Sequence, residues 1–221
     1  MPQYGKLIVE TVTNGPFQEN CFIAGDADTR KAILVDPGDE EELILSEVRS
    51  HDLEVTEIVC THAHVDHAGA VAPLKRILGV PFAVHSGELS TLSALPTTAR
   101  MFGLPEKEVP EVERELSAGD TLEVGDLSAT VLFTPGHSAG GVCLHFAEEK
   151  VVFVGDTLFA GSVGRTDLPG GSGEVLLESI KTQLLALDDD VVVYSGHGPD
   201  TTIGAERKGN PFLQPGNPFL F

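Results

Sequence analysis

The chain has 221 residues, of which 41% are hydrophobic, and this length permits one domain with a substantial buried core. Its 34 acidic and 14 basic side chains give a formal net charge of −20, which argues against nucleic acid or an anionic membrane as a partner. No run approaches the about 18 apolar residues of a membrane span, and no signal peptide is evident. We therefore expect a soluble, cytoplasmic protein with a single domain over residues 1–221.

Stretches rich in Val, Ile, Leu and Phe recur along the chain and predict strands, and the amphipathic stretches between them predict helices. The strands are expected at 7–12, 21–24, 32–35, 58–60, 82–84, 127–133, 142–146, 151–154 and 191–194. The helices are expected at 40–50, 69–78, 87–95 and 174–187, the last with Leu176, Ile180, Leu184 and Leu187 on one apolar face. Strands and helices that alternate in this way predict an α/β fold whose core lies between layers.

Side chains that can bind metals follow several predicted strands, at the point where each strand ends. The strand at 58–60 runs into the sequence THAHVDH, which contains His62, His64, Asp66 and His67. Four other strand ends carry one such residue each: Asp36, His137, Asp156 and His197. The last three each follow a glycine, which allows the backbone to turn sharply. Since loops at the ends of sheets commonly carry function, we expect these side chains to meet at one site.

The density of ligand-type residues in THAHVDH indicates metal binding. In an extended segment, His62, His64 and Asp66 would share a face, and His67 would point elsewhere or lie on a turn. With the residues at the other strand ends, the set exceeds what one four-coordinate zinc can use. It suits two metals, which sit about 3.5 to 4 Å apart in such sites and share a carboxylate. Because a water between paired metals is deprotonated near neutral pH, the predicted reaction is hydrolysis.

The cluster HAHVDH, followed in order by His137, Asp156 and His197, resembles the motif set of the metallo-β-lactamase superfamily over nearly the whole chain. The resemblance implies a four-layer αβ/βα sandwich, with two mixed sheets, helices on the outer faces and the site at one edge. It also implies two triads of metal ligands, bridged by Asp156: His62, His64 and His137 for the first metal, and Asp66, His67 and His197 for the second. Asp36, in LVDPG, matches a carboxylate that supports the site from behind.

Two features resemble a particular branch of this superfamily, the short bacterial type II glyoxalases. The β-lactamases usually carry Arg or Cys where this chain has His67, and often Cys where it has Asp156. The segment GDTLFAGSVGRTDLPGG at 155–171 and the tail TTIGAERKGNPFL at 201–213 also resemble that branch. Full-length glyoxalase II has a C-terminal helical domain that grips glutathione, and we expect none here. The Lys and Tyr that contact glutathione there are replaced by Arg165 and Asp167.

The resemblance implies a metal-dependent hydrolase of acyl thioesters such as S-lactoylglutathione, acting through a metal-bridging hydroxide. Two divalent ions are expected, zinc first, although His and carboxylate ligands also accept iron and manganese. Asp66 would orient the hydroxide while binding metal, and Asp156 would complete the catalytic pair. A thiol with a pKa of about 8.5 can leave as the thiolate, without a proton donor. Arg165 could bind a substrate carboxylate, with a structural ion pair as the alternative.

Other functions stay open at this point. Persulfide dioxygenases, which use a single iron, share the segment Gly164, Arg165, Thr166 and Asp167 after the equivalent Asp. Lactone hydrolysis needs the same ligands, whereas an RNA-processing nuclease conflicts with the acidic composition. A binding module without activity would need a degenerate site. The sequence leaves the oligomeric state undetermined.

The remaining Cys and His residues are not placed at the ends of predicted strands. Cys21, Cys60 and Cys143 are odd in number, far apart and set among apolar residues, which predicts buried free thiols. His51, His85 and His145 are expected to be structural or to lie on the surface.

Overall fold

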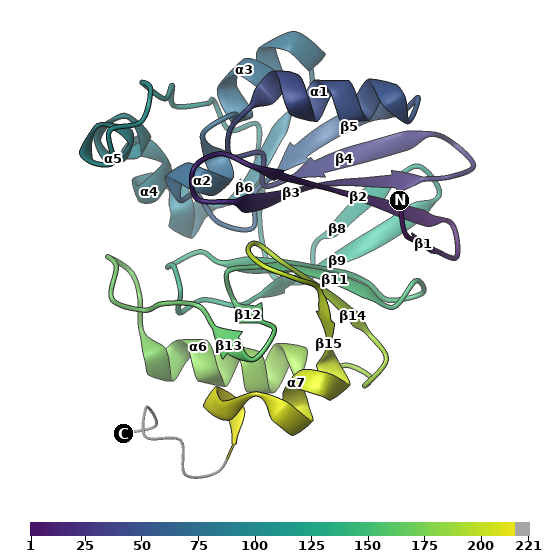
Figure 1. The fold of residues 1–221 in the computed structure, drawn as a ribbon, viewed down its shortest axis with the longest axis vertical. Helices are drawn as coiled ribbons and strands as arrows, with labels where there is room; N and C mark the ends of the chain where they lie inside the picture. The colour runs from purple at the N-terminus through teal and green to yellow at the C-terminus, as the bar shows by residue number, and fades with distance from the viewer. Residues whose placement is uncertain (215–221) are drawn as a thin grey trace.

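A computed structural model describes residues 1–214 as two facing β-sheets with helices on the outer faces (Figure 1). The first sheet has the strand order β1-β2-β3-β4-β5-β6-β7. It is antiparallel from β1 to β4 and parallel from β4 to β7. Its strands are β1 (Gln3–Tyr4), β2 (Leu7–Asn14), β3 (Glu19–Asp26), β4 (Lys31–Val35), β5 (Glu54–Val59), β6 (Phe82–His85) and β7 (Arg114–Leu116).

The second sheet has the order β15-β14-β11-β10-β9-β8, and within it β11 and β14 run parallel while the other pairs are antiparallel. Its strands are β8 (Thr121–Val124), β9 (Leu127–Phe133), β10 (Val142–Phe146), β11 (Val151–Gly155), β14 (Val192–Ser195) and β15 (Thr201–Thr202). A separate hairpin follows β11 and consists of β12 (Leu158–Phe159) and β13 (Ser162–Val163).

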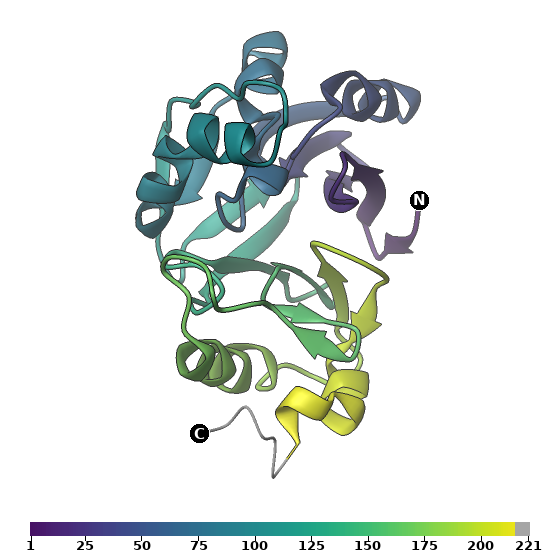
Figure 2. The same ribbon diagram turned by 60° about the vertical axis from the view of Figure 1, so that its left-hand side comes forward.

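The helices cover the outer face of each sheet. Those of the first sheet are α1 (Glu41–Ser50), α2 (Val65–Ala68), α3 (Val71–Leu78), α4 (Leu89–Ser93) and α5 (Leu95–Met101), with a 3-10 turn at Ser86–Glu88. Those of the second sheet are α6 (Gly173–Ser179), its π-helical extension at Ile180–Leu184, α7 (Ile203–Gly209) and a 3-10 turn at Pro211–Leu213. Figure 2 shows the purple-to-teal first half and the green-to-yellow second half on opposite sides of the molecule.

Three apolar clusters fill the spaces between these layers. The middle cluster lies between the sheets and contains Phe22 and Phe153, whose ring centroids are 5.1 Å apart. A second cluster packs Ile44 and Leu74 against the first sheet, and a third packs Leu176, Ile180 and Leu184 against the second. Three buried interfaces define four layers, which confirms the predicted αβ/βα sandwich. The apolar face predicted for 174–187 is also confirmed for these three residues, although the helix ends before Leu187.

Each predicted strand is present, β9 and β10 with the predicted ends and the others with shifted ends, and several elements were not predicted. β5 begins at Glu54, which pairs with Lys31 of β4, and not at residue 58. Its first half alternates polar and apolar residues, so the apolar run in the sequence marked only its second half. The helix predicted at 87–95 is divided into a 3-10 turn and two helices that extend to Met101. The elements β1, β7, β8, β12, β13, β15 and α7 are short or polar, and periodicity gives little signal for them.

Other expectations concern the whole chain. Cys21, Cys60 and Cys143 are buried and free, as predicted. Across residues 1–214, none of the helices has the length and apolar character needed to span a bilayer. A single domain over 1–221 and a cytoplasmic location stay predictions, and the former extends beyond the residues described here.

Candidate metal centre

The ends of five strands from both sheets meet at one edge of the sandwich. β5 leads to His62, β9 to His137, β11 to Asp156 and β14 to His197, while β4 leads to Asp36. Backbone hydrogen bonds join the loops across the two sheets: Val142 donates to the Thr61 carbonyl at 2.9 Å, and Asn20 to that of Gly196 at 2.8 Å. The structure therefore brings together every residue predicted as a metal ligand, from positions spread over most of the chain.

His62, His64 and His137, the first triad, offer ligand atoms that all lie within 4.8 Å of one another. His64 Nδ1 and His137 Nε2 are 3.0 Å apart. The other ring nitrogen of His137 lies 2.8 Å from the Arg165 carbonyl, which orients the ring. Burial lowers the pKa of His64 to about 4 and that of His62 well below its usual value. These imidazoles are therefore neutral near pH 7, the form that binds metals.

Asp66, His67 and His197, the second triad, likewise lie within 4.8 Å of one another. His197 Nε2 is 3.4 Å from Asp66 Oδ2. Burial lowers the pKa of His67, but the carboxylates of Asp156 and Asp66 outweigh it and raise that pKa well above the usual value. Burial also lowers the pKa of His197, but its hydrogen bond with Asp66 and the charge of Asp156 outweigh this effect and raise that pKa overall. The second triad thus attracts positive charge.

Asp156 stands between the two triads. Its Oδ1 is 3.4 Å from His67 Nε2, and its Oδ2 is 3.6 Å from His137 Nε2 and 3.7 Å from His197 Nε2. Burial disfavours the charged carboxylate, but His67 and the neighbouring imidazoles lower the pKa of Asp156 overall. One carboxylate that reaches both triads has the placement required of a bridging ligand.

Several buried polar atoms of this cluster have no hydrogen-bond partner among residues 1–214. They include His62 Nε2, His67 Nε2 and Asp156 Oδ1. Leaving a buried polar group unpaired is unfavourable, and a cation bound between these atoms would satisfy all three. The residues present therefore fit a metal centre of His and carboxylate ligands.

The extended geometry expected for THAHVDH is wrong beyond His64. His64 has extended backbone angles and precedes α2, so Asp66 and His67 lie on a helical turn. The alternation that would put Asp66 on the same face as His62 stops there, and Asp66 joins His67 in the second triad. Tertiary packing fixes this turn, because a Cβ on Gly38 would lie 1.5 Å from the Asp66 carbonyl oxygen.

Two buried carboxylates lie behind His67. Asp36 accepts hydrogen bonds from the backbone and hydroxyl of Thr61, both at 2.6 Å, and its Oδ2 is 3.2 Å from His67 Nδ1. This is the supporting position implied by the resemblance. Glu19, which the sequence analysis missed, has Oε1 3.7 Å from the same nitrogen, and burial raises its pKa well above the usual value. A carboxylate at the start of an apolar strand was the only signal for Glu19.

Arg165 approaches the centre through its backbone and not through its guanidinium. Its carbonyl orients His137, while the side chain is exposed and forms a two-pronged ion pair with Asp167, at 2.7 Å for each contact. This geometry matches the structural ion pair considered for Arg165. Its role as a substrate ligand stays a prediction.

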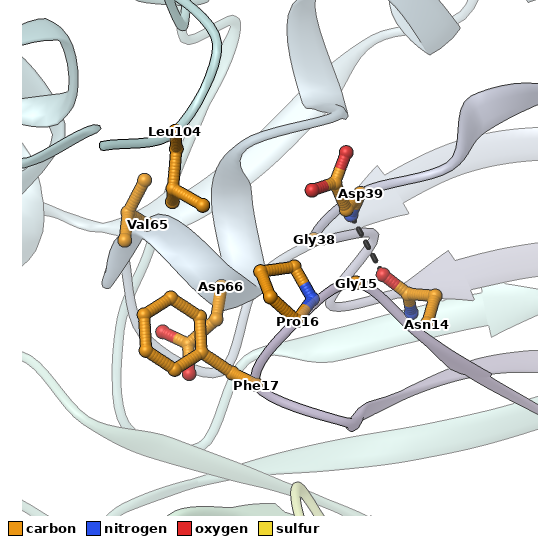
Figure 3. Close-up of a pocket in the computed structure, with 9 residues that line it drawn as sticks. All are labelled: Asn14, Gly15, Pro16, Phe17, Gly38, Asp39, Val65, Asp66 and Leu104. Carbon is orange, nitrogen blue, oxygen red and sulfur yellow. Dashed lines mark hydrogen bonds between the residues drawn. The ribbon is translucent and has the colours of Figure 1, made fainter. Parts of the chain in front are cut away.

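A small pocket, with a cavity volume of about 10 Å³, lies beside Asp66 (Figure 3). Phe17, Pro16, Val65 and Leu104 form its apolar part, and Asp39 lies on its polar side. The Phe17 ring also packs edge-on against Phe102, with centroids 5.3 Å apart. Asp66 of the second triad thus has apolar side chains beside it.

The three other histidines lie outside the cluster. His85 accepts a hydrogen bond from the Gly87 amide and stacks on Phe133, a structural role. His51 lies within 3.7 Å of Glu10 and Glu47 near the surface, and His145 is half-buried in β10. Both outcomes agree with the expectation from sequence.

The model of the metallo-beta-lactamase superfamily matches residues 14–197, and the chain belongs to this superfamily. The chain is 38% identical to the hydroxyacylglutathione hydrolase GloC of Haemophilus influenzae over 207 residues, which cover 93% of this chain and 97% of that protein. This similarity over nearly the full length of GloC confirms the branch indicated by the sequence.

Solved structures of the superfamily give the same architecture. The BLEG-1 B3 metallo-beta-lactamase has a TM-score of 0.87 at 37% identity, over 94% of this chain and 100% of that chain. TTHA1623 in a di-iron-bound form has a TM-score of 0.85 at 42% identity, over 92% and 100%. ETHE1 from Myxococcus xanthus has a TM-score of 0.78 at 27% identity, over 92% and 83%. This chain thus shares the fold of these structures, of which TTHA1623 is described with two irons, and its His-rich triads fit divalent metals.

Proposed function

We propose that this protein hydrolyses acyl thioesters of the S-lactoylglutathione type at a centre of two divalent metals. The observation that carries the proposal is the Asp156 carboxylate, which reaches both triads in a cluster that keeps His or Asp at every ligand position. The similarity to GloC supports a hydroxyacylglutathione as the substrate. Zinc remains the first expectation, and the similarity to di-iron TTHA1623 gives iron support as well.

In this proposal the first triad holds one metal, the second triad holds the other, and Asp156 bridges them. The metals would polarise the thioester carbonyl and lower the pKa of a water. Burial opposes ionisation of Asp66, but His67 and His197 lower its pKa, so the carboxylate is charged at neutral pH. It can therefore accept a hydrogen bond from the attacking water and orient it. No proton donor is needed for the leaving thiolate, because thiols have pKa values of about 8.5.

The surroundings favour a substrate whose thiol part carries charge and whose acyl part is small. Arg165 orients His137 through its carbonyl, and its guanidinium is exposed. A substrate carboxylate could replace Asp167 as the partner of this guanidinium. The apolar wall of Phe17 and Leu104 beside Asp66 would limit the water that enters with the acyl group. The substrate is thus expected to lie across the cluster, between these two borders.

Release of free thiol from S-lactoylglutathione tests the proposal, with metal content measured on the same preparation. We expect thiol release that requires close to two metals per chain and that disappears on chelation. A β-lactam belongs in the same assay because BLEG-1 is a B3 metallo-beta-lactamase. Protein loaded with two metals that hydrolyses the β-lactam, or nothing, and releases no thiol from any acyl thioester would contradict the proposal.

A persulfide dioxygenase with one iron is the second candidate. It is favoured by the segment Gly164, Arg165, Thr166 and Asp167, which persulfide dioxygenases share. One iron per chain with oxygen uptake on glutathione persulfide would establish this candidate and remove the hydrolase. Two metals per chain without oxygen uptake would remove the dioxygenase. Lactone hydrolysis is tested by adding a lactone to the same screen.

A further inference from the structure

Glu88 is a fully buried carboxylate that joins the two loops of the first triad. It ends the 3-10 turn Ser86–Glu88 that follows β6, and its side chain is 0% exposed. Its Oε2 accepts a hydrogen bond of 2.9 Å from the amide of Ala63, and its Oε1 accepts one of 2.7 Å from the amide of Gly140. Ala63 lies between His62 and His64, and Gly140 lies on the loop that follows His137.

From this geometry we propose that Glu88 is a positioning residue for the first metal, which sets the distance between the loop of His62 and His64 and the loop of His137. The inference rests on the proposed metal centre. The two loops follow strands of different sheets, so hydrogen bonding within one sheet does not fix the distance between them. The Val142 amide donates to the Thr61 carbonyl beside these loops, and the Glu88 side chain joins them at Ala63 and Gly140, next to the metal ligands.

The packing around Glu88 supports a precise separation. A Cβ on Gly140 would lie 2.8 Å from the Glu88 nitrogen, and a Cβ on Gly87 would lie 2.8 Å from the Gly140 Cα. The backbones of the two segments are therefore in direct contact, and a larger side chain at either glycine would separate them. Among the described residues, the hydrogen bonds of the Glu88 side chain all go to the two amides of the ligand loops.

The second triad has different supports. Asp36 and Glu19 lie behind His67, and Gly196 packs against Asp156 and His67. None of the hydrogen bonds that Glu88 makes in residues 1–214 reaches these groups. A defect at Glu88 is therefore expected to weaken one metal position and to spare the other.

Glu88→Gln tests this role, because glutamine keeps the size of the side chain but places an amide NH2 against one of the two N–H donors. Metal-free protein is titrated with Co²⁺, and the absorption spectrum reports each occupied position. We expect one of the two affinities to fall by about 10- to 100-fold, as for other residues that orient metal ligands, with the other within about threefold. The spectrum of the variant should match that of His64→Ala, which lacks the first triad, and not that of His197→Ala.

Glu206→Gln is the matched control. Glu206 is 4% exposed and accepts hydrogen bonds from the Gly161 amide at 2.8 Å and from Thr201 at 2.7 Å, away from the first triad. Both variants should lower the melting temperature, but only Glu88→Gln should change the Co²⁺ titration. Glu88→Asp, which keeps the carboxylate, should recover part of the affinity and serves if the glutamine variant does not fold.

Unchanged Co²⁺ binding in Glu88→Gln would show that Glu88 only stabilises the fold. The same conclusion would follow if Glu88→Gln and Glu206→Gln lost Co²⁺ affinity equally at both metal positions. If Glu88→Asp binds both metals no better than the glutamine variant, the inference is also overturned. Failure of the wild-type protein to bind two metals would instead count against the proposed function. The two outcomes are therefore distinguishable.

Discussion

The two triads place the same imidazole group in opposite electrostatic surroundings. In the first, burial and the neighbouring imidazoles keep His62 and His64 neutral, and the Glu88 carboxylate holds the loops through their backbone amides. In the second, Asp66 and Asp156 in front and Asp36 behind raise the pKa of His67. The surroundings of the first triad thus favour neutral imidazoles, whereas the carboxylates of the second favour a positive charge, whether a proton or a metal. The two metal positions thus differ in charge: buried neutral imidazoles define the first, and imidazoles beside carboxylates define the second.

Replacing Asp156 should impair both metal positions, because this carboxylate contacts histidines of both triads. Asp156→Ala is expected to lose both metals and to reduce thiol release by more than the roughly 10²- to 10³-fold typical of one electrostatic contact. Metal analysis and thioester assays measure this. Asp190→Asn is the control, since Asp190 is exposed and pairs with Lys150. An Asp156→Ala protein that retains two metals would contradict the bridging role.

Replacing Asp36 should affect the second triad more than the first, because Asp36 contacts His67 directly and reaches His62 through Thr61. In Asp36→Asn one acceptor oxygen becomes an NH2 group that faces Thr61 and His67, and affinity for one metal should fall by about 10- to 100-fold. Asp36 has φ of 54°, so Asp52→Asn, at φ 50° on the surface, controls for the backbone effect. Co²⁺ titration should give the spectrum of His197→Ala. Loss of the first metal would contradict the division between triads.

The stability of the metal-free protein should depend on pH with opposite signs at the two triads. The folded state depresses the pKa of His64 from 6.5 to about 4, so its contribution is present above pH 6.5 and is lost as the pH falls toward 4. The size is about 2 kcal/mol, reduced from the full shift because His64 is not fully buried. His67 and His197 have raised pKa values, so their contribution is present below pH 6.5 and is lost at higher pH.

Urea unfolding in the presence of a chelator, at pH values from 4.5 to 7.5, measures this dependence. Relative to His64→Gln, the wild-type protein should lose stability as the pH falls, and relative to His197→Gln it should lose stability as the pH rises. If the free energy of unfolding depends on pH in the same way for the wild type and both variants, the electrostatic surroundings of the two triads do not differ.

The smallest effect on the centre is expected from Arg165→Ala. Because the guanidinium is exposed and pairs only with Asp167 in the described structure, metal content and melting temperature should not change. The KM for S-lactoylglutathione should rise roughly tenfold, as for the loss of one charge-assisted hydrogen bond, with kcat retained. A thioester without a carboxylate is the control substrate. An equal change for both substrates would remove Arg165 from the substrate site.

The sequence was sufficient to predict the fold and the cluster because strand ends carry local signals. An apolar run that stops at Gly155 or Gly196 and continues with Asp156 or His197 marks both the strand and the residue that the turn presents. Within THAHVDH the departure of His67 from the shared face was predicted, but the placement of Asp66 was not, since the helical turn packs against Gly38, which is distant in sequence. Glu19 and Glu88 were missed because each is a single carboxylate whose role depends on neighbours distant in sequence. Short strands such as β7 and β8 lack a full period of the pattern.

The contact between His64 and His137 joins positions 73 residues apart, in loops that follow strands of different sheets. A metal bound by the first triad therefore closes a long loop and links the two halves of the sandwich, much as a removable crosslink would. An unfolded chain has no such arrangement, so the free energy of metal binding adds to the free energy of unfolding. The backbone amides of Asn20 and Val142, which bridge the sheets, should then exchange hydrogen more slowly once metal is added.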